Sequence, residues 1–415
     1  MNRIANSSLS RQAWKRLKKI EIADILVGIP SYNNAHTINY VVYQVAKGLE
    51  TYFPNLKTLI FISDGNSIDG TLATIEAMRL PSKVDLFSAT YEGVSGKGSA
   101  VKAIFEAASF LGVKSVALVD SDLRSITPHW IRMLISPTLS GTGLVTPYYM
   151  RHKYDGTITN FLCYPITASL YGKEIRQPIG GDFGLSIELI KNLLESPLWQ
   201  TPYVPRFGID IFETHTALAR KFKIKQAFLG TKIHEAKDPG KHLGSMFRQV
   251  VGSMLTCIES YAKVWKEIHD QEKVEVIGEE KFALTPEEVH VDLKSLMRTF
   301  KVGFEENRQI YRTILSDDLL RNVEKLEKMD KDENWFSPEI WAKTVLLFVA
   351  SFRNKEQLKR DKFLDALRIL WIGKVASFIR ETLELDTVKA EKKIEEEVSA
   401  FKKFKPYLLD LFERD

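Results

Sequence analysis

Short apolar runs alternate with segments of helical spacing in the N-terminal third of this 415-residue chain. Asp24–Pro30, Leu56–Ser63, Val84–Ser88 and Ser115–Val119 are short and rich in apolar residues, which predicts buried strands. Between them, stretches such as Thr37–Phe53 carry apolar residues three and four positions apart, as amphipathic helices do. Strands that alternate with helices are typical of βαβ units. We therefore predict an α/β fold with a mostly parallel sheet.

The strand pattern continues to about residue 235 and then fades. A chain of 415 residues is also longer than a typical single core. Helical spacing dominates the C-terminal part, over residues 247–269, 291–309, 315–329, 340–352, 363–383 and 388–401. We therefore predict two domains, an α/β domain over residues 1–240 and a mainly α-helical domain over residues 241–415.

Composition excludes several classes of protein. The net charge of +5 comes without a basic block that contains aromatic residues, so nothing indicates a nucleic-acid surface. Cys163 and Cys257 lack the spacing of a zinc site or a disulfide framework, which favours a reducing compartment. Residues 1–19 lack the apolar core of a signal peptide, and the apolar segments 344–352 and 366–379 are too short or too charged for a membrane span. We expect a cytoplasmic protein.

Four polar loops follow the predicted strands, at Pro30–Asn34, Ser63–Gly70, Gly93–Ser99 and Asp120–Leu123. In a Rossmann-like sheet every strand-to-helix loop lies at the same edge, and ligands bind outside the carboxyl ends of the strands. Each loop alone would be interpreted as an ordinary turn. Their convergence at one edge favours a binding site of nucleotide-binding type.

Asp120 and Asp122 end the apolar strand that leads into them. Two carboxylates one residue apart suit a hydrated divalent cation and the phosphates that it carries. His234 ends the last predicted strand of the same sheet, so it could complete an oxygen-and-nitrogen metal site with Asp122. His215 and His242 are the nearest competitors, and a structural histidine is the alternative.

Two further loop residues suit a nucleotide. Asp64 ends its strand, where a carboxylate can accept a hydrogen bond from a base, although a turn-forming aspartate before Gly65 is the alternative. Lys97 lies between two glycines and could present a cation to phosphates. The loop is not a Walker P-loop, because the required spacing and the Ser or Thr after the lysine are missing. A solvated lysine is the alternative.

Three more candidates follow along the chain. Glycines in the Gly180–Gly184 loop would let the backbone approach a ligand closely, or would simply form a tight turn. Arg151 and Thr159 flank a polar segment, where the arginine could hold a carboxylate through two parallel hydrogen bonds. Asp210 opens a predicted helix, where an acid can also serve only to stabilise the helix dipole.

Taken together, these motifs resemble those of a GT-A glycosyltransferase. The resemblance covers about residues 24–240 and rests on Pro30-Ser31-Tyr32-Asn33, the Ser63–Thr71 loop, Gly96-Lys97-Gly98 and Asp120-Ser121-Asp122. More narrowly, the chain is similar to the retaining enzymes that make mannosylglycerate, glucosylglycerate or glucosyl-3-phosphoglycerate. This narrower similarity rests on Arg151 to Thr159, the Gly180–Gly184 loop, Gly208-Ile209-Asp210-Ile211 and His234.

The resemblance implies transfer of mannose or glucose from a nucleoside-diphosphate sugar to D-glycerate, with retention at the anomeric carbon. It implies nucleotide binding by Pro30, Tyr32, Asn33, Asp64 and Lys97. Asp120 would contact the ribose and the sugar, and Asp122 with His234 would bind Mg²⁺ or Mn²⁺. Acceptor binding would fall to Arg151, Thr159, Gly180, Gly181 and Asp210. Asp120, Asp122 and Asp210 are thus the predicted catalytic residues, and no protein nucleophile is expected.

Several alternatives stay open. The acceptor could be 3-phosphoglycerate, although the few basic residues near Arg151 and Lys153 favour the unphosphorylated acid. The donor base is open, because Asn33-Asn34-Ala35 stands where many relatives carry a glutamate that reads the base. A nucleotide-sugar-binding protein without transferase activity is a third hypothesis. The C-terminal tryptophans, which are Trp335, Trp341 and Trp371, suit a helical core or a homodimer interface.

Overall fold

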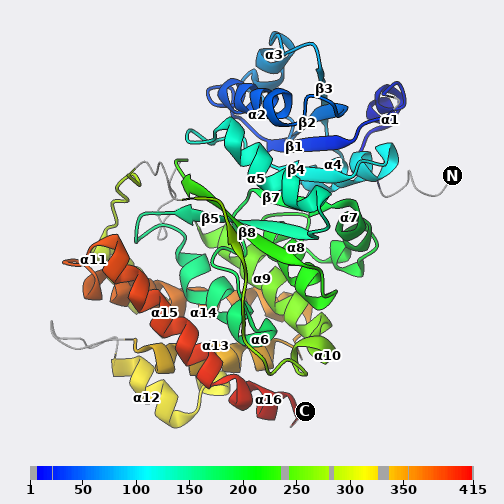
Figure 1. Ribbon diagram of the computed structural model, residues 1–415. Helices are drawn as coiled ribbons and strands as arrows, with labels where there is room; N and C mark the ends of the chain where they lie inside the picture. Colours follow the sequence, from blue (N-terminus) through cyan, green and yellow to red (C-terminus); the bar gives the residue numbers. More distant parts are fainter. Residues whose placement is uncertain are drawn as a thin grey trace. The chain divides into compact units, whose positions relative to one another are not determined.

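The computed structural model describes residues 7–20, 22–234, 243–279, 285–325, 336–353 and 355–413. Two compact units make up the chain (Figure 1). The sheet unit comprises residues 1–150, 177–235 and 274–286, and the helical unit comprises residues 151–176, 236–273 and 287–415. The predicted domain boundary at residue 240, as well as His242 and Trp335, lies outside the described residues. That boundary stays a prediction.

An eight-stranded sheet forms the centre of the sheet unit, in the order β10-β8-β5-β7-β4-β1-β2-β3. The strands are β1 (Ile25–Ser31), β2 (Thr58–Asp64), β3 (Val84–Thr90), β4 (Ser115–Leu118), β5 (Leu144–Met150), β7 (Phe183–Ser186), β8 (Ile224–Thr231) and β10 (Val276–Ile277). Only β7 runs antiparallel to its neighbours, which are β4 and β5. The prediction of a mostly parallel α/β sheet is confirmed.

One edge strand comes from a region that the sequence analysis assigned to helices. Val276 pairs with Gln226, and Ile277 pairs with Ala227, so β10 extends the sheet beyond β8. A strand of two residues is too short to show an alternating pattern in the sequence. This strand was therefore visible only in the structure.

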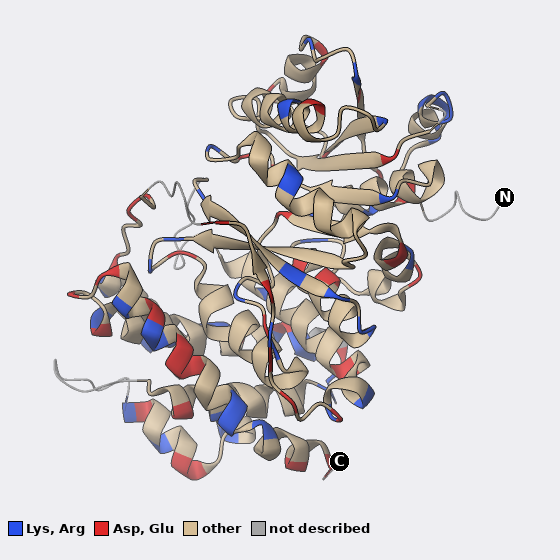
Figure 2. Cartoon of the chain, in the orientation of Figure 1, with Lys and Arg blue, Asp and Glu red and all other residues tan. Residues whose placement is uncertain are grey.

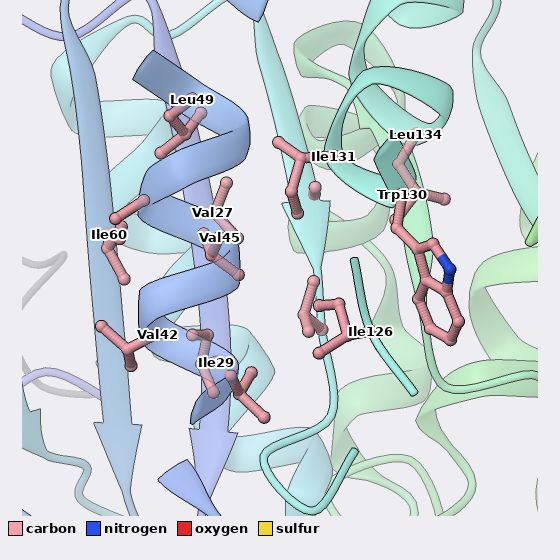
Figure 3. Close-up of a cluster of buried hydrophobic side chains, with 14 of the residues drawn as sticks. Val27, Ile29, Val42, Val45, Leu49, Ile60, Ile126, Trp130, Ile131 and Leu134 are labelled. Carbon is pink, nitrogen blue, oxygen red and sulfur yellow. The ribbon is translucent and has the colours of Figure 1, made fainter. Parts of the chain in front are cut away.

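Helix α2 illustrates how apolar spacing builds the core of the sheet unit. Its buried residues Val42, Val45 and Leu49 face Val27 of β1 and Ile60 of β2 (Figure 3). Burying each such side chain contributes about 1.5–3 kcal/mol. The other helices of this unit are α1 (Arg11–Leu17), α3 (Thr71–Glu76), α4 (Lys97–Leu111), α5 (Pro128–Leu139), α7 (Ile187–Leu194), the short 3₁₀ helix η2 (Pro197–Gln200) and α8 (Ile209–Ala219). Helix α2 itself spans Ile38–Tyr52.

The helical unit begins with the π-helix η1 (Thr159–Cys163) and α6 (Tyr164–Tyr171). Two short strands, β6 (Lys173–Glu174) and β9 (Glu272–Lys273), pair in parallel. The remaining helices are α9 (Gly244–Ser260), α10 (Ala262–Trp265), α11 (Leu293–Ile314), α12 (Asp317–Lys325), α13 (Pro338–Phe352), α14 (Gln357–Glu381), α15 (Thr387–Lys403) and α16 (Lys405–Glu413). The predicted helical C-terminal region is thereby confirmed.

Core and surface are clearly separated in the helical unit. Trp341 and Trp371 are fully buried, which confirms their predicted role in core packing. Charges of both signs are interspersed along α12 and α15 (Figure 2), where Lys393 pairs with Glu396 one turn away. Exposed pairs of this kind contribute little to stability, about 0–1 kcal/mol. Within the described part of the chain, no helix has the length and apolar character that a membrane crossing requires.

Candidate active site

The loops that follow β1, β2 and β4 are tied together at the carboxyl edge of the sheet. The Asn33 N–H donates to Ser67 Oγ (2.8 Å), which joins the first loop to the second. Ser121 Oγ donates to Asn34 Oδ1 (2.7 Å), and Thr37 Oγ1 donates to the Ser121 carbonyl (2.8 Å). The strand order changes direction between β1 and β4, where ligands bind in open α/β sheets. The predicted convergence of these loops is confirmed.

Asp120 lies between two lysines at this edge. Lys97 Nζ is 2.8 Å from Asp120 Oδ1, and Lys232 Nζ is 2.9 Å from Asp120 Oδ2. Burial alone would raise the pKa of Asp120, but the two ammonium groups hold it well below its usual range. Asp120 is therefore ionised, and each of its oxygens already accepts a charged hydrogen bond.

Asp182 connects the same lysine to the backbone of Asp120. Its carboxylate accepts the Asp120 N–H (2.8 Å), the Lys232 ammonium (3.0 Å) and the Tyr149 hydroxyl. Lys232 also donates to the Gly180 carbonyl (2.9 Å), so its three N–H donors point to three acceptors. Burial raises the pKa of Asp182, and Lys232 opposes that rise. The result is a buried polar network with defined positions for Asp120 and Lys232.

Helix α8 adds Asp210 to this network and carries a second, buried acid, Glu213. Asp210, in the first turn of α8, lies 3.2 Å from Lys97 Nζ. Glu213 follows one turn later and is fully buried. Among the described residues neither carboxyl oxygen of Glu213 has a hydrogen-bond partner. Burial raises the pKa of Glu213 well above its usual range, and Asp210 and Asp120 add to this rise, which favours the protonated form.

Gly181 is the position where Asp120 and the glycine loop approach most closely. Its φ of +88° lies in the left-handed region, and an added Cβ would lie 2.1 Å from Asp120 Oδ2. A side chain at this position would therefore collide with the carboxylate that the two lysines hold. Close approach to the Asp120 side chain explains the glycine at this position, whereas the predicted approach of Gly180 and Gly181 to the acceptor stays a prediction.

Replacing Gly181 with alanine should lower the affinity for the donor nucleotide roughly tenfold, because it displaces Asp120. The matched control is Gly112→Ala, since Gly112 has a φ of +65° but nothing within 4 Å of an added Cβ. Both variants should share a backbone penalty of about 1 kcal/mol, measured by thermal unfolding. Equal nucleotide affinities in the two variants would contradict the role of Gly181.

A close internal contact explains the glycine that follows Lys97. An added Cβ at Gly98 would lie 1.9 Å from the Val204 carbonyl oxygen. The Gly98 N–H donates to the Arg206 carbonyl (3.0 Å), and the Ser99 N–H donates to the Pro205 carbonyl (2.9 Å). These two backbone amides therefore bind carbonyls of the protein itself. Only the Lys97 side chain, held by Asp120 and Asp210, belongs to the charged network.

Asp122 and His234 lie on two segments that the backbone joins. The Arg124 N–H donates to the Ile233 carbonyl (2.9 Å), and the Ile233 N–H donates to Ser125 Oγ (2.9 Å). Asp122 is half-buried, and no hydrogen bond or ion pair engages its carboxylate among the described residues. A half-buried carboxylate without a protein partner suits a divalent cation, and metal binding by Asp122 and His234 stays a prediction.

The described residues contain no group of three or more His, Cys, Asp or Glu side chains arranged to hold a metal ion. A cation at Asp122 and His234 would thus complete its coordination with water and ligand oxygens, as Mg²⁺ commonly does. The competitor His215 is fully buried in α8, and burial lowers its pKa to about 3. His215 is therefore a core residue.

Among the predicted nucleotide-binding residues, Tyr32 is the most open. Its side chain is 62% exposed at the carboxyl edge, as an aromatic ring that stacks on a base would need to be. Asp64 is instead fully buried and accepts hydrogen bonds from Ser31 Oγ (2.9 Å) and from the N–H (2.8 Å) and Oγ (2.7 Å) of Ser67. Asn33 Oδ1 accepts the Ile68 N–H (3.0 Å). Base recognition by Asp64, Asn33 and the half-buried Pro30 stays a prediction.

Arg151 and Thr159 belong to the helical unit, whereas the network around Asp120 belongs to the sheet unit. Arg151 Nη1 lies 3.3 Å from Asp155 Oδ2. A Cβ added to Gly156 would lie 3.5 Å from Arg151 Nη1 and 3.8 Å from Thr159 Oγ1, so these two side chains meet beside this glycine. Their predicted role in acceptor binding stays a prediction.

Three members of the network were not predicted from the sequence, namely Tyr149, Asp182 and Lys232, and neither was the buried acid Glu213. One pattern pointed to Lys232, because it stands two residues before His234 at the end of a strand, where such residues share a face. No sequence pattern predicts the pairing of Asp182 with Lys232. The two residues are 50 positions apart, and only the tertiary fold brings them together.

The chain is similar to curated proteins that are named glucosyl-3-phosphoglycerate synthase. A glucosyl-3-phosphoglycerate synthase from Mycobacterium tuberculosis is 25% identical over 251 residues, which cover 56% of this chain and 72% of the relative. The synthase from Mycolicibacterium paratuberculosis is 25% identical over 276 residues, which cover 61% of this chain and 79% of the relative. These relatives support the resemblance to the GT-A glycosyltransferases. No model of a protein family matches the sequence.

Solved structures of the Mycobacterium tuberculosis synthase are also similar. The complex with Mg²⁺ and uridine diphosphate is 25% identical, with a TM-score of 0.45, and covers 58% of this chain and 83% of that one. The complex with Mn²⁺, uridine diphosphate and phosphoglyceric acid is 24% identical, with a TM-score of 0.44, and covers 60% and 82%.

Proposed function

We propose that this glycosyltransferase moves a hexose from a nucleoside-diphosphate sugar to 3-phosphoglycerate. The observation that carries the proposal is the network in which Lys97 and Lys232 hold an ionised Asp120 at the carboxyl edge of the sheet. The names of the curated relatives support 3-phosphoglycerate as the acceptor, which the sequence analysis had placed second after D-glycerate. A cytoplasmic location and a homodimer stay predictions.

The side chains at the sheet edge suit the departure of a diphosphate. Asp122 and His234 would hold Mg²⁺ or Mn²⁺, which supplies positive charge to a leaving diphosphate when it is bound. Lys97 provides a second cation, because burial would lower its pKa but Asp120 and Asp210 raise it far enough to keep it protonated. Asp120 and Asp210 would accept hydrogen bonds from hydroxyls of the donor, and Tyr32 would stack on its base.

D-glycerate is the second candidate acceptor, and one observation favours it. Lys153 was counted among the cations that could bind an acceptor, but its ammonium donates to the carbonyls of Thr382, Leu383 and Leu385. Arg151 is in turn paired with Asp155. Less positive charge is therefore left for a phosphate group in this segment.

A matrix of donors and acceptors tests the proposal. Uridine and guanosine diphosphate sugars, each with glucose or mannose, are assayed with 3-phosphoglycerate or D-glycerate. We expect transfer to 3-phosphoglycerate from one donor and loss of that activity in EDTA, restored by Mg²⁺ or Mn²⁺. Transfer to D-glycerate alone would select the second candidate. Donor binding without transfer to either acid would instead indicate a nucleotide-sugar-binding protein.

A further inference from the structure

Lys153 joins the segment of residues 151–159, here called the acceptor segment, to the end of α14. Its ammonium donates hydrogen bonds to the carbonyls of Thr382 (2.7 Å), Leu383 (3.2 Å) and Leu385 (2.6 Å). An ammonium has three N–H donors, so these contacts use all of them. Carbonyls at the end of a helix lack partners within the helix and carry partial negative charge. Lys153 therefore binds the C-cap residue of α14, Thr382, and the turn that follows it, and has no donor left for a ligand.

Two fully buried tryptophans reach the same stretch of chain. Trp371 of α14 donates its indole N–H to the Thr157 carbonyl (3.3 Å), and Trp341 of α13 donates to the Phe161 carbonyl (2.7 Å). An indole has a single donor, and each tryptophan uses it on this stretch. The backbone around the start of η1 is thus bonded to two separate C-terminal helices.

A third helix acts through Arg176. Its guanidinium donates to Glu391 Oε2 of α15 (2.9 Å) and to Asn160 Oδ1 (3.0 Å). The Asn160 side chain in turn donates to the Asp155 carbonyl (3.1 Å), and Asp155 is the residue that pairs with Arg151. The position of Arg151 is therefore linked, through four successive contacts, to α15.

We propose that helices α13, α14 and α15 hold the acceptor segment in its binding conformation, with Lys153 as a positioning residue. This inference rests on the proposed function, since it takes Arg151 and Thr159 as the groups that contact the acceptor. Ordering a loop at the moment of binding opposes binding, so a segment that is already fixed binds its ligand more tightly. The C-terminal helices thereby control the affinity for the acceptor but not for the donor.

Lys153→Met tests the inference, because methionine keeps an apolar stem and removes the ammonium. The control is Lys359→Met, since Lys359 is exposed near the other end of α14. We expect the KM for 3-phosphoglycerate to rise roughly tenfold in Lys153→Met, while the Kd for the donor nucleotide with Mg²⁺ stays within about twofold. Amide hydrogen exchange over residues 151–159 of the free protein should become faster, roughly tenfold. The control should change none of these.

The exchange measurement separates the outcomes. A raised KM with unchanged exchange would mean that Lys153 contacts the acceptor itself, and would overturn the inference. Faster exchange with an unchanged KM would overturn it as well, since the segment would then not control acceptor binding. If the wild-type protein transfers to no acceptor, the proposed function fails, and exchange alone decides whether the helices hold the segment. Should Lys153→Met not fold, Tyr154→Phe removes a weaker bond to the Ile379 carbonyl (3.3 Å) and should give smaller changes in the same direction.

Discussion

Replacing Lys232 with methionine should remove most of the transferase activity and destabilise the sheet unit. The Lys232 side chain is only 4% exposed, so water cannot take the place of its ammonium between Asp120 and Asp182. Breaking a buried ion pair by removing one partner costs about 3–5 kcal/mol. Activity should fall roughly 100-fold or more, because Asp120 loses one of the two groups that fix it. Urea unfolding and a transfer assay measure the two effects.

Low pH should reduce the loss of stability in Lys232→Met. Burial raises the pKa of Asp182 above its ordinary 3.8, and Lys232 opposes this, so the pKa should rise further in the variant. A carboxyl whose pKa is higher in the folded than in the unfolded state binds its proton more tightly when folded. The variant therefore gains stability relative to the wild type as the pH falls toward that raised pKa. Urea unfolding of the wild type and of Lys232→Met at about pH 7.5 and about pH 5.5 measures this difference in stability.

Lys225→Met is the matched control for Lys232→Met, because both lysines come from the same part of the chain, Lys225 within β8 and Lys232 just after it. Lys225 lies 2.9 Å from Glu275, whose side chain is 57% exposed. Loss of so exposed a pair should cost only about 0–1 kcal/mol. Similar losses of stability and activity in the two variants would contradict a special role for Lys232.

Asp122→Asn should lower the metal-dependent activity roughly 100-fold or more, since a bound cation supplies several kcal/mol to a leaving phosphate and each 1.36 kcal/mol is a factor of ten. The fold should be little affected, within about 0.5 kcal/mol, because the half-buried carboxylate has no protein partner among the described residues. Rates measured across a range of Mn²⁺ concentrations should show a raised metal requirement. His234→Gln should likewise lower the metal-dependent activity and raise the metal requirement.

The control for this second prediction is Asp85→Asn, which removes an exposed acid from β3. It should leave both the rate and the metal requirement unchanged. If Asp122→Asn and His234→Gln also keep the wild-type metal dependence, the cation binds elsewhere. Loss of activity with an unchanged metal requirement would instead indicate that Asp122 binds the donor nucleotide sugar.

The fold was largely predictable where patterns are local. Strands β1, β2 and β4 are buried along their length in the sheet and therefore read as continuous apolar runs. Helix α5 escaped prediction, since Pro137 lies inside it and interrupts the helical pattern. The predicted helix over residues 247–269 is in fact two helices, α9 and α10, separated at Tyr261. Interruptions of a helix of this kind depend on tertiary packing rather than on the spacing of apolar residues.

By itself the sequence predicted that the site lies at the carboxyl edge of the sheet, and it named Asp120, Asp122 and Lys97 there. This was possible because strand and helix periods are local properties of the chain, and parallel topology places their loops together. Only the tertiary structure decided what these residues touch. Lys232 reaches Asp120 across 112 positions, and no local pattern encodes such a distance. For the same reason the sequence did not predict that Lys153 binds the Thr382 carbonyl at the end of α14, 229 positions away.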